Sequence, residues 1–257
     1  MRKLATRSMA KAMLVLFAAL GASIPMILPA DATADPITMV LITAEISGGG
    51  ESSTYFWSFP APSTPSGTWS WTMSQPFQAY NGGTLLGSID ALSMTANGDP
   101  GVSASFAVTA GSSPTNFTVN SGLVSFGAIV NPLAFASAGI TLTDMDSDGA
   151  TLTGLYTGAN AYKATYNGSV DWAFLLPGLI AGADNTAVLN GRQPGSGRLP
   201  ISATLTSIQS QFYFTLTAND QASGSSRFDV QAPVPEPATL LLLGTGLVTL
   251  FVRRKKA

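Results

Sequence analysis

Val102-Ser103-Ala104-Ser105-Phe106-Ala107-Val108 carries an apolar side chain at every second position. Thr68-Trp69-Ser70-Trp71-Thr72-Met73 repeats this pattern with larger apolar side chains. Successive side chains of a β-strand point to opposite faces, so a period of two predicts a strand with one buried face. These two stretches therefore predict that the chain is built from strands.

The same period extends over most of residues 35–231. The buried parity is odd over 201–205 and even over 212–218, which predicts a bulge or turn near 206–211. Gly- and Asn-rich turn signals separate the strand-like runs, and we expect loops at 60–67 and 190–198. The one helix-like run, 173–183, is interrupted by a Pro and a Gly. We therefore predict an all-β domain, an antiparallel β-sandwich or a jelly-roll-like body.

The 257 residues include no Cys and no His, and only 10% are charged, against about 25% in an average domain. Disulfides, thiolate nucleophiles, His-held metals and the Ser-His-Asp triad are therefore excluded. Glu45, Glu51, Asp90 and Asp171 are scattered, and nothing in the sequence pairs them as a glycoside hydrolase would require. We expect a protein that is not an enzyme.

Charge is unevenly distributed along the chain. Between residues 35 and 234 there are four basic and twelve acidic residues, a net charge of −8, whereas both ends of the chain are basic. An acidic body repels nucleic acid phosphates, so no nucleic-acid partner is expected. Basic ends next to apolar runs are typical of membrane targeting.

The N-terminus has the layout of a secretory signal peptide. A positive segment over 1–11 precedes a short apolar run over 12–20, and Ala32 and Ala34 form an A-x-A cleavage site. We expect a signal helix that the secretion translocon recognises and that is removed with residues 1–34. An uncleaved N-terminal membrane anchor is the alternative.

The C-terminal segment, 232–257, has three parts. Residues 238–252 are apolar and uncharged, slightly shorter than the roughly 20 residues of a typical transmembrane helix. A rigid, helix-breaking motif precedes this run and a basic stop follows it, which places the basic residues in the cytoplasm and the body outside. The motif is Val234, Pro235, Glu236 and Pro237, and the stop is Arg253, Arg254, Lys255 and Lys256.

This tripartite tail resembles the PEP-CTERM sorting signal of Gram-negative bacteria. The resemblance implies recognition by an exosortase, a membrane peptidase that cuts near the Pro-Glu-Pro. It further implies export, an intermediate anchored in the inner membrane, and delivery to the cell surface or extracellular matrix. The alternative is a single-span anchor that is never cut.

Asp144-Met145-Asp146-Ser147-Asp148-Gly149 places carboxylates at positions 1, 3 and 5 and Gly at 6, like the first half of a calcium loop. Position 12 is Leu155 instead of the bidentate Glu, and the flanks are strand-like, so the loop is no EF-hand. Asp144, Asp146 and Asp148 are candidate Ca²⁺ ligands. The alternative is an acidic hairpin turn.

Aromatic side chains are dense over 55–80, where Trp69 and Trp71 share one strand face. An exposed face of this kind could stack on sugar rings, whereas ordinary core packing is the competing interpretation. From the two targeting segments together we predict an exosortase-sorted surface or matrix protein with a structural or adhesive role in an exopolysaccharide layer or biofilm. A carbohydrate-binding module and, less favoured, a carboxylate-based glycoside hydrolase are the alternatives.

Overall fold

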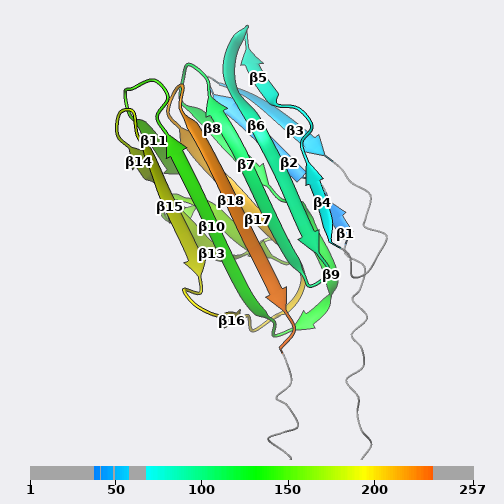
Figure 1. Cartoon of the computed structure of the whole chain (residues 1–257). Helices are drawn as coiled ribbons and strands as arrows, with labels where there is room; N and C mark the ends of the chain where they lie inside the picture. Colours follow the sequence, from blue (N-terminus) through cyan, green and yellow to red (C-terminus); the bar gives the residue numbers. More distant parts are fainter. Residues whose placement is uncertain (1–37, 41, 49, 58–67, 234–257) are drawn as a thin grey trace, which may run out of the picture. The chain divides into compact units, whose positions relative to one another are not determined.

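The computed structural model describes residues 38–40, 42–48, 50–57 and 68–233. Over these residues the chain forms two antiparallel sheets, and the one helical element is a 3-10 turn, η1 (Thr157–Ala159). The sheets pack face to face around one continuous apolar core (Figure 1). The predicted all-β, antiparallel β-sandwich is therefore confirmed. The helices expected in the signal and transmembrane segments lie outside the described residues.

The first sheet is organised around its longest strand, β17 (Thr204–Leu216). One edge of β17 pairs with β9 and β8, and the other edge pairs with β12 and β11. The remaining strands extend the sheet outward from these four. In chain order the other nine strands are β1 (Thr38–Val40), β2 (Ile42–Gly48), β3 (Glu51–Trp57), β8 (Thr115–Asn120), β9 (Leu123–Val130), β11 (Ala150–Gly154), β12 (Asn160–Tyr166), β13 (Val170–Pro177) and β14 (Leu179–Ala181).

The second sheet has the order β15-β10-β18-β7-β6-β4, with β16 on β10 and β5 on β6. Its central strands β10, β18, β7 and β6 are long, and they lie side by side across the front of the sandwich in Figure 1. The strands are β4 (Trp69–Thr72), β5 (Phe77–Asn81), β6 (Thr84–Asn97), β7 (Gly101–Ala110), β10 (Leu133–Thr143), β15 (Thr186–Gln193), β16 (Leu199–Pro200) and β18 (Gln221–Gln231).

Aromatic contacts join the two sheets at the centre of the core. Phe106 of β7 meets Phe212 of β17 edge-on at 4.8 Å between ring centroids, and it stacks on Phe214 at 5.9 Å. Small inward residues of β10, among them Ala134, Ala136 and Ala138, alternate with outward ones along that strand. The inner faces of the two sheets thus carry both large aromatic and small side chains and form one close-packed core.

A buried hydroxyl network also connects the sheets. The hydroxyl of Ser210 in β17 lies 3.0 Å from the Tyr162 hydroxyl and 2.8 Å from the Ser226 hydroxyl of β18. Tyr162 is fully buried, and burial raises the pKa of its phenol above the ordinary value of 10. The tyrosine therefore stays neutral and serves as a hydrogen-bond partner inside the core.

Two local predictions have different outcomes. The parity switch predicted near 206–211 is confirmed as a bulge, because the register between β17 and β9 shifts between Leu205 and Ser207. The loop predicted over 190–198 is wrong in its first half, since β15 continues to Gln193. Asn190 and Gly191 are paired with Gly139 and Ala138 of β10, so strand pairing overrides the local turn preference of Asn-Gly.

Replacing Phe212 with Ala should strongly destabilise the sandwich. The side chain is fully buried between the sheets, so the change leaves a cavity and should cost about 3–5 kcal/mol of unfolding free energy. Urea unfolding followed by circular dichroism measures this difference. Ser105→Ala, on the exposed face of β7, should change the unfolding free energy by less than about 0.5 kcal/mol. Equal effects of the two substitutions would contradict the packing described.

Candidate functional site

The most chemically distinctive region is the loop that joins β10 to β11, residues 144–149. Ser147 and Gly149 adopt positive φ angles of 71° and 95°, which turn the chain sharply back. The Asp144 carboxylate is buried and organises the turn, because it accepts hydrogen bonds from the backbone N–H of Gly149 at 3.1 Å and of Asp184 at 2.6 Å. This first aspartate is therefore a structural anchor of the loop.

A distant aspartate joins the loop. Asp220 precedes β18, is fully buried, and accepts hydrogen bonds from the N–H of Met145 at 3.3 Å and from the Thr217 hydroxyl. One carboxylate oxygen each from Asp144, Asp146 and Asp220 lie within 4.8 Å of one another. The structure thus places a third carboxylate beside the first two predicted ligands, 72 residues after Asp148 in the sequence.

Asp148 lies outside that group of three but contacts Asp146. A hydrogen bond from the side chain of Asn219, 2.9 Å long, lowers the pKa of Asp146. Hydrogen bonding to Asp146, followed by charge repulsion from it, raises the pKa of Asp148. The two exposed carboxyl groups therefore differ in how readily each takes up a proton.

The oxygen-rich cluster has the donor chemistry that a hard cation requires. Calcium takes six to eight oxygen ligands at about 2.3–2.6 Å, and carboxylates are its usual side-chain ligands. A cation would also offset the repulsion among Asp144, Asp146 and Asp220. The cluster supplies three such side chains, and Ca²⁺ binding by the loop stays a prediction.

The aromatic pair predicted as a sugar-stacking face lies on the inner side of its strand. Trp69 and Trp71 of β4 are half-buried and pack against the core. They are paired with Ala96 and Met94, both of which are buried, while the alternate residues of the strand, Ser70 and Thr72, are exposed. This geometry matches the core-packing interpretation, and carbohydrate stacking by the two tryptophans stays a prediction.

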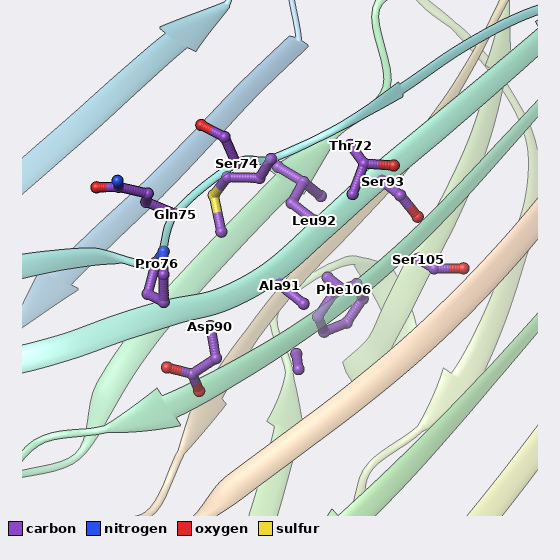
Figure 2. A pocket seen from close by; sticks show the side chains of 12 residues that line it. Thr72, Ser74, Gln75, Pro76, Asp90, Ala91, Leu92, Ser93, Ser105 and Phe106 are labelled. Carbon is purple, nitrogen blue, oxygen red and sulfur yellow. The ribbon is translucent and has the colours of Figure 1, made fainter.

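A small hollow of about 280 Å³ lies where the β4–β5 connection passes over β6 and β7 (Figure 2). Asp90 projects beside it from a bulge in β6, and its carboxylate accepts hydrogen bonds of 2.6 Å from the hydroxyls of Ser88 and Thr109. Most glycoside hydrolases use two carboxyl groups about 5–9.5 Å apart. Among the described residues that line this hollow, Asp90 is the only carboxylate.

Residues 233–256 match the family model of the PEP-CTERM protein-sorting motif. The resemblance drawn from the Pro-Glu-Pro, the apolar run and the basic stop is thereby confirmed for the C-terminal segment. A comparison with curated proteins finds no match to the chain. The sorting residues 234–237, the basic stop 253–256, and the signal cleavage site at Ala32 and Ala34 lie outside the described residues. Within the described part of the chain, no helix is long and apolar enough to span a membrane.

Asp148→Asn should stabilise the protein at neutral pH in the presence of a chelator. The folded-state pKa of Asp148 is raised, so the ionised side chain costs stability once the pH exceeds that pKa, and Asn removes this cost. At a pH low enough to protonate Asp148 in both the folded and unfolded states, the variant and the wild type should melt at the same temperature. Thermal melts across the acidic-to-neutral range check this. A stabilisation that grows as the pH falls would contradict the assignment.

Proposed function

We propose that the chain is a secreted, exosortase-sorted protein of the cell surface or extracellular matrix, with a structural or adhesive role in an exopolysaccharide layer. The observation that carries this proposal is the sorting-motif match at residues 233–256. A sorting motif is an address read by processing machinery, so it identifies a destination and one partner, the exosortase. The secretory layout of the N-terminus supports the same route through the translocon.

The surface of the sandwich suits a matrix role. The outer face of the second sheet presents small hydroxyl side chains in neighbouring strands, including Ser103, Ser105, Thr141, Ser223 and Ser225. Hydroxyls donate and accept hydrogen bonds, as sugar hydroxyls do. A broad, hydroxyl-bearing face supports contact with hydrated glycans better than it supports catalysis, and we propose a role without enzymatic activity.

The proposed route has distinct stages in a Gram-negative cell. The signal peptide directs export, and the apolar run over 238–252 with the basic stop after it holds the chain in the inner membrane. The exosortase then cuts near Pro235–Pro237 and frees the sandwich. An intermediate fixed in the membrane and a final product outside it are both consequences of this order.

Glu236→Ala should trap the chain in the membrane fraction. The substitution removes the central residue of the sorting motif while leaving both the apolar run and the folded body intact. Fractionation of cells expressing a chain tagged within the body, with detection of the tag, measures the distribution. Glu51→Ala, which removes a glutamate from β3, should be sorted like the wild type. A wild-type product found in the cytoplasm would refute the proposed route outright.

We also propose that the 144–149 loop binds Ca²⁺. The proximity of three carboxylates from two separate segments, Asp144 and Asp146 with Asp220, favours this second function. A site that joins the end of β10 to the start of β18 would tie together two neighbouring strands of the second sheet. Calcium would then act as a structural ion in an extracellular protein.

Millimolar Ca²⁺ should raise the melting temperature relative to EDTA, because an ion that binds only the folded state stabilises it by mass action. Mg²⁺ should have a smaller effect, since it demands stricter octahedral geometry. Asp146→Ala should remove most of the Ca²⁺ effect, whereas Asp99→Ala, an exposed aspartate in another turn, should retain it. Identical wild-type melts in Ca²⁺ and EDTA would show that the loop is only an acidic turn.

A further inference from the structure

Positive charge is concentrated at one corner of an otherwise acidic sandwich. The described residues contain four basic side chains, and three of them lie in or beside the second sheet: Arg192 in β15, Arg198 directly before β16 and Arg227 in β18. Lys163 lies in β12 of the other sheet, where it is paired with Asp171 at 3.1 Å. The three arginines therefore make up a local feature that the net charge of the body conceals.

Strand register sets two of these arginines on either side of one serine. Ser137 of β10 is the partner of Arg192 on β15 and of Arg227 on β18, and all three side chains point to the outer face. Neighbouring strands lie about 4.8 Å apart, so the two arginine backbones are separated by roughly 10 Å. Long side chains at that separation can both reach an anion placed over Ser137.

Contacts at the corner leave guanidinium groups available to a ligand. The buried Asp229 carboxylate accepts a 2.5 Å contact from Nε of Arg227, and Arg198 lies 3.9 Å from the same oxygen. Arg192 covers the Phe135 ring at 4.5 Å and donates one hydrogen bond, to the Gly197 carbonyl at 3.2 Å. The Asp229 carboxylate thus contacts two of the three arginines, and the corner keeps a net positive charge.

An open hollow of about 420 Å³ lies between the two flanking arginines. This volume falls within the range of small-molecule sites. Gly139, which has no side chain, lies at the base of the hollow. The side-chain amide of Asn190 lies close to this glycine, since a Cβ on Gly139 would be 2.5 Å from the amide oxygen. The outward-facing residues that line the hollow are Ser137, Gly139, Asn190, Arg192, Ser225 and Arg227.

The polar groups in the hollow are also unpartnered. Among the described residues, the side chains of Ser137, Asn190 and Ser225 make no hydrogen bond with another protein group, and neither do the terminal nitrogens of Arg227. A hydroxyl both donates and accepts, an amide does the same, and a guanidinium only donates. The hollow therefore combines a site for one negative charge with several groups suited to neutral hydroxyls.

We infer that this corner, defined by Arg192, Ser137 and Arg227, binds the carboxylate of an acidic sugar residue within a glycan chain. Arginine pairs with carboxylates through charge-assisted hydrogen bonds, which are the stronger kind. Asn190 and Ser225 lie in the next row of the sheet, where the hydroxyls of the same sugar would be. The inference rests on the proposed matrix role for the source of the glycan, while the site itself rests on the geometry.

Binding of the purified full-length chain in detergent to polygalacturonate, a polyuronate, tests this site, with neutral dextran as the comparison ligand. Arg192→Gln and Ser137→Glu each change the net charge by −1 at the corner. Lys163→Gln and Ser93→Glu make the same change elsewhere, Ser93 being on the outer face of β6. Both corner variants should weaken polygalacturonate binding by about tenfold or more, since each disrupts a charge-assisted contact. Both control variants should bind like the wild type.

Several results would overturn the inference. Equal losses in all four variants would show that binding follows net charge, and equal wild-type binding of dextran and polygalacturonate would show that no carboxylate is recognised. Failure of the wild type to bind polygalacturonate would remove the site. A change in the oligomeric state of Ser137→Glu, without a change in glycan binding, would assign the corner to a contact between copies of the chain. Because the assay uses purified protein, none of these results depends on sorting, which the cell fractionation tests separately.

Discussion

The contact between Phe106 of β7 and Phe212 of β17 crosses the interior of the sandwich and holds the two sheets in one relative position. β17 pairs with four other strands, so fixing its inner face fixes most of the first sheet. The hydroxyl network of Ser210, Tyr162 and Ser226 lies one layer further along the same strand and is satisfied only in this arrangement. Buried hydroxyls would be costly if unpaired, so the network supports one specific packing of the sheets.

The register between β10 and β18 determines which polar and charged side chains of the second sheet lie close together. Thr143 lies opposite Gln221, so the loop after β10 meets Asp220, the residue before β18. Ten residues back along β10, Leu133 lies opposite Gln231, and the arginine corner is built around Ser137, between these two ends. The acidic cluster thus lies at one end of this strand pair and the arginine corner about midway along it. A single change of register would separate both sets of side chains.

Local patterning in the sequence was sufficient for the fold class and for the bulge in β17, because both depend on the period of apolar residues. Asp220 could not be found in the same way, since its proximity to Asp144 depends on long-range strand pairing that no local pattern contains. The same reason explains the arginine corner, whose members Ser137 and Arg227 are separated by 90 positions in the sequence. The turn predicted from Asn190-Gly191 is absent because this dipeptide can also be accommodated in a paired strand, where Gly191 faces the Leu175 side chain.

The proposed function requires that the sandwich is exported with two processing segments and delivered without them. Intact-mass measurement of the protein recovered from outside the cell tests this most directly. We predict a mass that lacks residues 1–34 and the residues that follow the Pro235–Pro237 motif, with any additional mass attributable to a covalent modification. A recovered protein with the mass of all 257 residues would contradict it.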